Sequence, residues 1–522
     1  MRIYNAREKE IPKNNDKGFA VLALLVGFLF IIRLLFLAAT FYFFSIYTNV
    51  TGLVRIGKTI NVAKGGDFQS ALTQAKGGDV NLLEAGAVFK GSFKLPNIAG
   101  NDFVTIRSSA DPSRLPPPGT RINPEQHANL LPKIESNVRG EPAILAVKGA
   151  HHFRFVGIEF LPTIDGLCNI IQLGSTEEKE IGELPHHIEF DQVYIHGSPV
   201  HGQRRGIAAN GKFIKIANSH ISDIKRKGEE SQAIALWATD GPVEIVNNYL
   251  EAAAENILFG GAESFLNLAP TDCLVSGNHL DKPLKWREEG WLVKNLFEIK
   301  HGRRIKVVNN LMTNNWANGQ SGTAVLFTTN DDSGKSVIIE DIEFSNNIVR
   351  SSPHAVNVKG DNGKGGHRLI IRNNFFEGIG DFDGGGRFMT ATDWQGLTIE
   401  NNTIINTGNI TSAYGDPITG FIFRNNIIFE NEYGFHGDSM TPGKASIDKY
   451  FPASDISFNV IIGGKPSNYS GKNLFVNSID QIGFVDYKVK NYSLRADSPL
   501  RSRGLKGGII GADINTAATG EK

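Results

Sequence analysis

The sequence has only two cysteines, Cys168 and Cys273, in 522 residues. Two cysteines are too few for a disulfide framework, so the fold has to be held by its core, and we expect both residues to be buried free thiols. A net charge is missing as well, because 54 lysine and arginine residues balance 54 aspartate and glutamate residues. Without a basic field the chain has no electrostatic means of holding nucleic acid, which argues against that class of partner.

Long apolar runs are also scarce, and the clear exception is residues 18–47. This segment is apolar apart from Arg33 and a few hydroxyl side chains, and about 20 such residues span a bilayer. The residues before it include five basic side chains: Arg2, Arg7, Lys9, Lys13 and Lys17. A basic flank stays in the cytoplasm. We therefore predict one transmembrane helix in the inner or plasma membrane, with the rest of the chain in the periplasm or outside the cell.

A cleaved signal peptide is the alternative interpretation of this run. Its length and the lack of a small-residue cleavage site before Thr48 disfavour cleavage. Arg33 costs about 2.5–3.5 kcal/mol at the centre of a bilayer. The side chain is therefore expected either to reach a lipid headgroup or to contact a partner protein in the membrane.

A doubled asparagine recurs along the chain inside short β-like runs. The second asparagine of each pair, with two related positions, falls at Asn248, Asn278, Asn310, Asn347, Asn374, Asn402, Asn426 and Asn459. These positions are 24 to 37 residues apart, a period typical of solenoids and propellers. Asparagine tolerates left-handed backbone angles, and turns stacked about 4.8 Å apart let its amides form a ladder. Each repeat is therefore predicted to be a strand, a tight bend at the asparagines and another strand.

The segment before the ladder has the pattern of a solenoid cap. Asp67 is a suitable N-cap for a short helix, and Gly77 and Gly78 are suited to end it. The apolar face of this helix would consist of Phe68, Ala71, Leu72 and Ala75. A solenoid needs such a cap because an open end exposes sheet edges and core.

With these repeats, this cap and the closing segments 492–500 and 511–513, the chain resembles the right-handed parallel β-helix proteins of the pectin-lyase-like superfamily. The resemblance implies an all-β solenoid with a short N-terminal capping helix. The expected organisation is a cytoplasmic segment 1–17, a transmembrane anchor 18–47, a linker 48–57, a β-helix domain 58–515 and a tail 516–522.

The outward side chains of the predicted solenoid define a first candidate site. Apolar and polar residues alternate in its strand-like runs, which places six side chains on one outer face: Trp237, Glu298, Lys300, Thr328, Asn357 and Lys359. Side chains repeated about 4.8 Å apart suit a linear polymer. We therefore expect a polysaccharide to bind this face.

Acidic-polysaccharide lyases of this superfamily cleave uronate-containing glycans by β-elimination. A lysine or arginine removes the proton next to the uronate carboxylate, while calcium or arginine neutralises that carboxylate. The chain resembles the alginate-lyase version, with a glutamate and a lysine on one strand. This resemblance implies Lys300 as the base, Glu298 as a metal or orienting ligand, and Arg303 or Arg304 as the carboxylate clamp. Asn357 and Lys359 are then expected to bind substrate.

A second polar constellation comes from successive predicted coils: Arg205, Glu229, Gln232, Glu255 and Asn256. This mixture suits sugar hydroxyls, carboxylates or one oxygen-ligated calcium ion. We predict that Arg205, Gln232 and Asn256 bind substrate and that Glu229, Glu255 and Glu298 are the calcium ligands. The three clustered aspartates of polygalacturonases are absent from the sequence, which argues against hydrolysis by paired carboxylates.

Aromatic and histidine residues provide the remaining candidates. Trp316 and Gln320 lie in an amide-rich segment, where the indole either stacks on sugar or covers a loop. Two adjacent histidine pairs, 151–152 and 186–187, suggest a metal at first sight. Neighbouring residues of a strand point to opposite faces, so we interpret these pairs as structural.

Two hypotheses follow from the sequence. In the first, the chain is a membrane-anchored, extracytoplasmic polysaccharide lyase or related carbohydrate-active enzyme with Lys300 at its centre. In the second, it is a non-catalytic β-helix that binds glycan or scaffolds an envelope assembly. The appearance of unsaturated uronate ends distinguishes them.

Overall fold

The computed structural model describes residues 57–146, 148–329, 337–360, 366–382 and 384–513. The chain divides into two units, residues 1–56 and residues 57–522, and every described residue belongs to the second unit. The predicted anchor 18–47 and Arg33 therefore lie outside the described residues. Across the ranges that the structure describes, no helix combines the length and the apolar character needed to cross a membrane.

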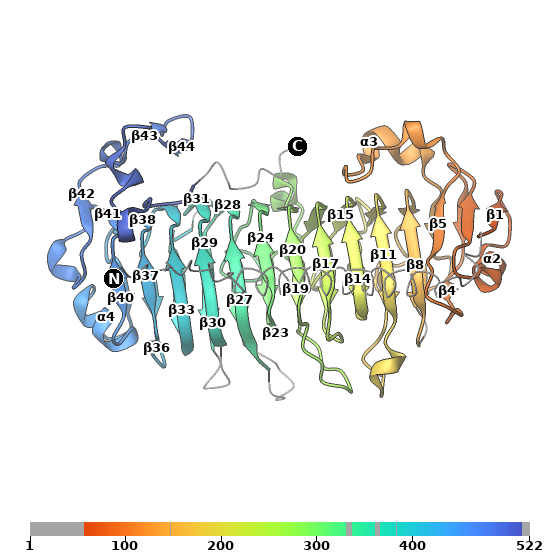
Figure 1. Ribbon diagram of the computed structural model, residues 1–522, viewed down its shortest axis with the longest axis horizontal. Helices are drawn as coiled ribbons and strands as arrows, with labels where there is room; N and C mark the ends of the chain where they lie inside the picture. The colour runs from red at the N-terminus through yellow and green to blue at the C-terminus, as the bar shows by residue number, and fades with distance from the viewer. Residues whose placement is uncertain (1–56, 147, 330–336, 361–365, 383, 514–522) are drawn as a thin grey trace, which may run out of the picture. The chain divides into compact units, whose positions relative to one another are not determined.

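The second unit is a stack of coils in which each full coil adds one strand to each of three parallel sheets, here called A, B and C (Figure 1). Among the described residues, sheet A is 16-stranded and sheet C is 12-stranded, while sheet B is 14-stranded. Each strand pairs with the equivalent strand of the coil before it and the coil after it. Consecutive coils therefore follow one another in sequence order, as the colours of Figure 1 show.

The strand bounds follow this repeat. Sheet A consists of β1 Thr59–Val62, β2 Val80–Leu83, β5 Val104–Ser108, β8 His151–Val156, β11 His186–Asp191, β14 Lys212–Ala217, β17 Val243–Val246, β20 Leu274–Ser276, β23 Gly302–Arg303, β24 Lys306–Val308, β27 Ile339–Ser345, β30 Gly366–Arg372, β33 Trp394–Glu400, β36 Ile418–Thr419, β37 Ile422–Arg424 and β40 Asp455–Ser457. Sheet B consists of β3 Val88–Lys90, β6 Lys133–Glu135, β9 Glu159–Phe160, β12 Tyr194–His196, β15 His220–Ile224, β18 Tyr249–Ala252, β21 His279–Asp281, β25 Leu311–Thr313, β28 Ile348–Ser352, β31 Phe375–Ile379, β34 Thr403–Asn406, β38 Ile427–Phe429, β41 Val460–Ile462 and β42 Leu474–Val476. Sheet C consists of β4 Phe93–Leu95, β7 Ile144–Ala146, β10 Asn169–Leu173, β13 Arg205–Ala209, β16 Gln232–Leu236, β19 Glu255–Phe259, β22 Asn295–Ile299, β26 Thr323–Thr328, β29 His354–Lys359, β32 Met389–Thr392, β35 Thr411–Ala413 and β39 Phe435–Gly437.

The asparagine ladder lies at the bend between sheets A and B, as the sequence predicts. The backbone N–H and the side-chain amide of Asn347 both donate to Oδ1 of Asn374, at 2.8 and 3.1 Å. Asn374 bonds Asn402 in the same way, at 2.9 and 3.0 Å. The pattern repeats from Asn248 to Asn459, and all eight predicted asparagines are fully buried.

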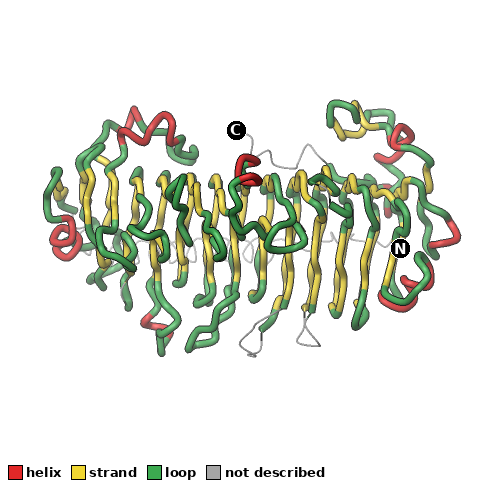
Figure 2. Tube along the Cα trace, turned by 180° about the vertical axis from the view of Figure 1, so that it is seen from behind, coloured by secondary structure: helices red, strands yellow, loops and turns green. Residues whose placement is uncertain are grey.

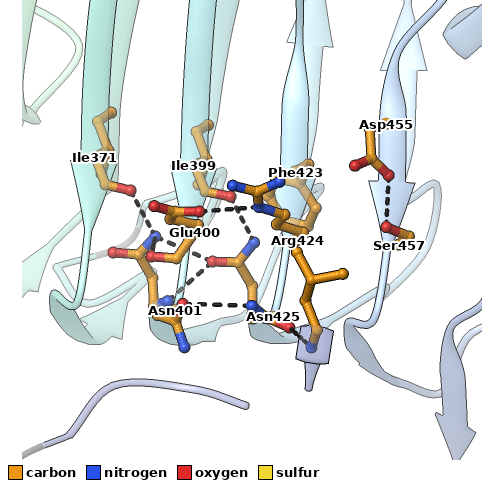
Figure 3. A network of polar contacts seen from close by, with 12 residues as sticks. Ile371, Ile399, Glu400, Asn401, Phe423, Arg424, Asn425, Asp455 and Ser457 are labelled. Carbon is orange, nitrogen blue, oxygen red and sulfur yellow. Dashed lines mark hydrogen bonds and ion pairs between the residues drawn. The ribbon is translucent and has the colours of Figure 1, made fainter. Parts of the chain in front are cut away.

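The first asparagine of each pair makes the bend itself. Its φ is positive in all six pairs, for example 54° at Asn401 and 55° at Asn425. Asparagine adopts this left-handed conformation more readily than most side chains. Figure 3 shows two such bends beside the ion pair of Arg424 with Glu400, whose Nε and Oε2 lie 2.9 Å apart. The doubled asparagine therefore combines a bend residue with a ladder residue.

Helices close the two ends of the stack (Figure 2). Helix α2, Phe68–Gln74, begins after Asp67, whose Oδ1 accepts a hydrogen bond from the Ser70 N–H at 2.9 Å. Its Phe68, Ala71 and Leu72 are buried in the core, which confirms the predicted cap. The helix ends before Ala75, earlier than the predicted glycine stop. At the other end, the core is covered by α4, Lys444–Tyr450, which the sequence analysis did not identify.

The closing segment 492–500 resembles the last turns of a β-helix in sequence, but in the structure it is not a last coil. It belongs to an antiparallel hairpin of β43, Phe484–Asp486, and β44, Asn491–Leu494, and to the turn that follows. This segment packs on the outer face of sheet B, where Tyr492 contacts Phe375 with ring centroids 4.6 Å apart. The chain then returns along the bends, and the N–H of Asp513 donates to Oδ1 of Asn373. Outer apolar residues of sheet B account for this difference, because they need a cover.

A second segment covers the N-terminal part of sheet B. Residues 109–131 include the short helix α3, Pro124–His127, and contact the bends through Arg121 and Ile122. The Nε of Arg121 donates to the Asn247 carbonyl at 3.2 Å. Sheet B is therefore covered by chain over much of its outer side, so a surface for a partner has to be sought on sheets A and C.

Candidate functional site

Polar side chains form a row across five strands of sheet C. One residue from each of β10, β13, β16, β19 and β22 stands at the same register position. These residues are, in order, Asn169, Arg205, Gln232, Glu255 and Asn295. Strands in a sheet lie about 4.8 Å apart, so side chains at equivalent positions touch their neighbours. We call this set the polar row.

Hydrogen bonds connect the polar row from coil to coil. Arg205 donates from one guanidinium nitrogen to Oδ1 of Asn169 at 3.0 Å and from Nε to Oε1 of Gln232 at 2.9 Å. Gln232 in turn donates to Oε2 of Glu255 at 2.8 Å. Gln232 and Glu255 have almost no exposed surface. Each member of the row therefore fixes the rotamer of the next.

Lys294 brings a buried cation to the row from the turn before β22. Its Nζ lies 2.9 Å from Oε1 of Glu255 and 2.6 Å from Oε1 of Glu230. Burial opposes the charge of Lys294, but the carboxylates of Glu255 and Glu230 together raise its pKa above the usual value. Lys294 is therefore held as a cation at neutral pH.

The row with Glu298 and Lys300 adjoins the polar row on the same face. Glu298 is in register with Leu326, which pairs with Asn357, and Thr328 pairs with Lys359. Lys300 comes directly after β22, one position beyond the Ile299–Phe327 pair. The predicted outer face is therefore confirmed for these residues. The side-chain amide of Asn295 donates to Oε2 of Glu298 at 3.0 Å and so joins the two rows.

The pKa values of the carboxyl groups of Glu298 and Glu230 shift in opposite directions. Burial raises the pKa of Glu298, and the nearby carboxylate of Glu255 raises it further, while Lys300 acts in the opposite direction. Burial also raises the pKa of Glu230, but Lys294 and Lys300 outweigh it and leave this pKa below the usual value. The face therefore holds two acidic groups close together with cationic side chains beside them.

Lys300 differs from Lys294 in its surroundings. It is half-buried, and among the described residues no carboxylate lies within ion-pair distance of its Nζ. Its aliphatic stem passes the open backbone of Gly261. An amine that is not already held by carboxylates is available to a substrate.

A hollow adjoins the N-terminal end of the polar row. It has a volume of about 500 Å³ and is lined by residues that include Leu145, Gln172 and Trp237. The guanidinium of Arg205 lies 4.9 Å from the centre of the Trp237 ring, which orients the indole by a cation–π contact. Burial lowers the pKa of Arg205 to about 10, so the group is still charged at neutral pH. This hollow extends the polar row by an aromatic surface.

Arg303 and Arg304 lie on a different face from Lys300. Arg303 belongs to β23, which pairs with β27 of sheet A. Arg304 makes two hydrogen bonds to Asp272, at 2.6 and 2.9 Å, and both side chains are about half exposed. The turn after Lys300 redirects the chain to sheet A, and sequence proximity alone could not reveal this change of face.

Asn256, which the sequence predicts to bind substrate, does not reach the outer face of sheet C. It is fully buried, and its amide donates to the carbonyls of Leu250 and Asp281 at 2.7 and 2.9 Å. Its Oδ1 accepts from Nζ of Lys282 at 3.0 Å. Lys282 is itself fully buried, and burial lowers its pKa to about 7. Asn256 therefore supports the turn beneath the polar row.

The indole of Trp316 is buried and is not presented to solvent for stacking on a sugar. Its indole is 6% exposed and packs in a cluster with Trp286, Trp291 and Val293. This outcome corresponds to the loop-covering alternative. Gln320, four residues later, is exposed in the turn that leads to β26.

The predicted calcium ligands are only partly brought together. Glu229 is exposed and lies 3.6 Å from Nε of Arg226, whereas Glu255 and Glu298 are buried on the sheet C face. The Oδ1 atom of Asn295 is buried, has no hydrogen-bond partner within the described part of the chain, and adds a third oxygen. Calcium takes 6–8 oxygen ligands, so these residues fit a calcium ion only together with substrate and water oxygens.

The sequence analysis missed Asn169 and Lys294 as members of this face. Asn169 begins a strand without an asparagine pair before it, and Lys294 precedes its strand in a turn. Lys294 could have been found by aligning the coils. It immediately precedes its sheet C strand, at the position that Ser231 and Ala254 hold in the two coils before it. The predicted residues that do lie on sheet C, Arg205, Gln232 and Glu255 of one candidate site and Glu298 and Lys300 of the other, form one continuous face.

The two histidine pairs contradict the prediction that their side chains point to opposite faces. His152 and His187 have positive φ values of 57° and 52°, which breaks the alternation of a strand. The Nδ1 atoms of His151 and His152 are 2.7 Å apart, and those of His186 and His187 are 2.8 Å apart. Both cysteines are free, as predicted, and Cys273 is buried while Cys168 is only half-buried.

Comparison with known proteins supports the coil architecture. No family model matches the sequence, and no curated protein matches it. Among solved structures, the PL6 family alginate lyase AlyGC superposes with a TM-score of 0.54 at 15% identity, over 88% of this chain and 58% of that chain. The fold is a parallel β-helix. An arginine variant of AlyGC matches over the same shares, with a TM-score of 0.54 at 14% identity.

The β-helix likeness covers only part of the comparison protein. This chain spans little more than half the length of AlyGC. A mannuronic acid specific polysaccharide family 6 lyase from human gut microbiota has a TM-score of 0.40 at 11% identity, over 81% of this chain and 84% of that chain. At such identities the likeness establishes the fold, and function has to be argued from the side chains of sheet C.

Proposed function

We propose that this β-helix binds an acidic, uronate-containing polysaccharide on the outer face of sheet C and cleaves it by β-elimination. The observation that carries the proposal is the continuous polar face that includes Arg205, Lys294 and Lys300. Cations beside hydrogen-bonding amides suit the carboxylates and hydroxyls of such a glycan. The fold shared with AlyGC, a PL6 alginate lyase by its description, is consistent with this choice.

Lys300 is the proposed base. Its Nζ takes the C5 proton of the uronate, the C4–C5 double bond forms, and the C4–O bond to the leaving sugar breaks. The departing oxygen then takes up a proton. Lys294 is unsuited to this role because its two carboxylate partners keep it protonated. A group must be deprotonated to act as a general base.

Arg205 is the proposed contact for substrate carboxylate, in place of Arg303 or Arg304. Its guanidinium lies on the same face as Lys300, stacks on Trp237 and is held by Asn169 and Gln232. Glu255, Glu298 and Asn295 are the proposed protein ligands of a calcium ion, which when bound would neutralise the substrate carboxylate. Asn357 and Lys359 extend the binding face towards the C-terminal coils.

The proposed location is the outer side of the inner or plasma membrane. The basic segment before residues 18–47 would keep the N-terminus in the cytoplasm. A permanent anchor suits an enzyme that trims a polymer during its export. Arg33 is proposed as the contact for a partner membrane protein.

The test is to follow the ultraviolet absorbance of unsaturated uronate ends when the full chain, in detergent, is mixed with a panel of uronate polymers and neutral glycans. Parallel reactions contain calcium or a chelator. The proposal predicts a rise with at least one uronate polymer and none with neutral glycans. No rise with any uronate polymer would reject the elimination reaction.

A non-catalytic role is the second candidate, and the burial of Glu255 and Glu298 in a closed hydrogen-bond network favours it. Such a face would bind glycan or scaffold an envelope assembly without chemistry. Glycan pull-down without any unsaturated product would support this alternative.

A further inference from the structure

Four histidines form a compact cluster where the chain enters sheet A, on the neighbouring strands β8 and β11. His151 and His186 are in register, and their rings are parallel with centroids 4.7 Å apart. The rings of His152 and His187 also stack, with centroids 4.4 Å apart. Across each pair the Nδ1 atoms face each other at 2.7 and 2.8 Å. The cluster therefore concentrates imidazole nitrogens from two coils at one place.

The backbone is shaped to bring these nitrogens together. An extended residue at position 152 would turn its side chain away from His151, because neighbours on a strand point to opposite faces. Left-handed backbone at His152 and His187 directs both rings back towards their partners. Left-handed φ values are uncommon for non-glycine residues, but they recur at the equivalent bend of later sheet A strands, at Phe213, Asp272, Arg304, Asp341 and Arg368. The bend therefore belongs to the coil, and histidines occupy it in two consecutive coils.

Hydrogen bonds determine which nitrogens are available as ligands. The Nε2 atom of His151 lies 3.2 Å from Oδ1 of Asn97, an atom that only accepts hydrogen bonds. The proton of neutral His151 is therefore on Nε2, and the lone pair of Nδ1 points to the other histidines. A ligating histidine typically donates its other N–H to an oxygen in this manner.

The distances are compatible with one metal ion. One ligand nitrogen from each of His151, His152 and His186 can be chosen so that all three lie within 4.8 Å of one another. With metal–nitrogen bonds of about 2.0–2.1 Å, two ligand nitrogens are about 2.9–3.4 Å apart. The pairs at 2.7 and 2.8 Å need to open only slightly, and the two coils need to approach locally.

We propose that His151, His152 and His186 form a binding site for a first-row transition-metal ion that bridges two consecutive coils. His187 and a water molecule compete for the fourth position. An all-imidazole set selects Zn²⁺, Ni²⁺ or Cu²⁺ rather than Ca²⁺ or Mg²⁺, which prefer oxygen. This site is on strands β8 and β11 of sheet A, several coils before strand β22, which Lys300 follows, and is independent of the proposed glycan chemistry. The ion joins the β8 coil to the β11 coil.

The surroundings of the cluster are consistent with this inference. Phe103 contacts His152 edge-on at 5.2 Å, and Phe213 stacks on His187 at 4.5 Å between ring centroids. The charged groups that face the cluster include Asp102, Lys212 and Glu189.

The test uses the full chain without a histidine tag. Zn²⁺ is titrated calorimetrically, and Co²⁺ binding is followed by its visible absorption. We expect one ion per chain, and at least tenfold weaker binding in a His151→Phe, His186→Phe double variant, which keeps the stacked rings but removes two ligands. His201→Gln, at an exposed turn outside the cluster, is the matched control and should bind as the unaltered chain does.

Equal stoichiometry and affinity in the double variant, or no bound Zn²⁺ in the unaltered chain, would overturn the proposal. If the double variant does not fold, as judged by circular dichroism, the unaltered chain is crystallised with Zn²⁺. Anomalous scattering at the zinc edge must then give a peak between the four Nδ1 atoms. A peak only elsewhere, or none, would also overturn it.

Discussion

Nζ of Lys294 lies 2.9 Å from Oε1 of Glu255, a carboxylate with no exposed surface. Removing one member of a buried pair leaves an uncompensated charge and costs about 3–5 kcal/mol. We therefore expect Lys294→Met to lower the free energy of unfolding by about this amount in urea denaturation. Lys306→Met, an exposed lysine on sheet A, is the control and should change it by under about 0.5 kcal/mol. Equal effects of the two changes would show that the pair has no structural role.

The asparagine ladder gives a second prediction. Asn347→Leu leaves the Asn310 N–H and the Val307 carbonyl buried without their side-chain partner. Each such orphaned group costs about 1–3 kcal/mol, so the thermal transition should fall markedly. Asn346→Gly is the matched control, because glycine keeps the left-handed bend at φ 56°. An Asn347→Leu melting curve like that of the unaltered chain would refute the ladder as a stabilising element.

The raised pKa of Glu251 predicts that the free energy of unfolding depends on pH. Burial raises its pKa to about 6, above the ordinary 4.5. The folded state then holds the proton more tightly than the unfolded state, so this contribution to stability is full below pH 4.5 and is lost as the pH rises through 6. Glu251→Gln removes the titration, so its stability relative to the unaltered chain should improve by about 1–2 kcal/mol between pH 4.5 and 7.

Urea denaturation at several pH values checks this expectation. The exposed Glu244→Gln, on sheet A, is the control and should show no such trend. A stability difference for Glu251→Gln that does not change over this pH range would contradict the assigned pKa.

Arg205 and Arg304 distinguish the two faces of the β-helix. Arg205→Ala removes a guanidinium that stacks on Trp237 in the polar row, so the dissociation constant for a uronate oligosaccharide should rise about tenfold or more. Arg304→Ala removes only an exposed ion pair with Asp272 and should leave it nearly unchanged. Calorimetric titration measures both. The reverse order of effects would place the glycan on sheet A.

Sheet A is a real competitor for the glycan. Its outer face has a hollow of about 970 Å³, whose lining includes Leu274, Ile370 and Arg368. Arg368 is held there by Asp341, at 2.5 Å. Two cations of this hollow, Arg304 and Arg368, are already paired with Asp272 and Asp341, which makes it the poorer match for an anionic polymer.

The sequence was sufficient for the coil but not for every side chain on it. Asn248 to Asn459 recur at a regular bend, so the ladder and the repeat of strand, bend and strand follow from local preferences. The N-cap Asp67 and its apolar helix are equally local. Period-two alternation placed Glu298, Asn357 and Lys359 correctly because β22 and β29 are regular strands.

Departures from regular backbone explain the errors. Asn256 directly follows the sheet B to sheet C bend and turns inwards to Lys282. His152 and His187 adopt left-handed φ values that no asparagine or glycine signals. The side chains of segment 492–500 alternate as in a coil, but they cover sheet B because its outer residues are apolar. Tertiary packing decides these cases.

The most direct test of the account is the rate of unsaturated uronate release by the unaltered full chain, by Lys300→Ala and by Lys306→Ala on the same polymer. Removing a general base typically costs 10²–10⁴-fold in rate. The account predicts a loss of about this size for Lys300→Ala, with an unchanged thermal transition, and full activity for Lys306→Ala. Retained product release by a folded Lys300→Ala chain would contradict it.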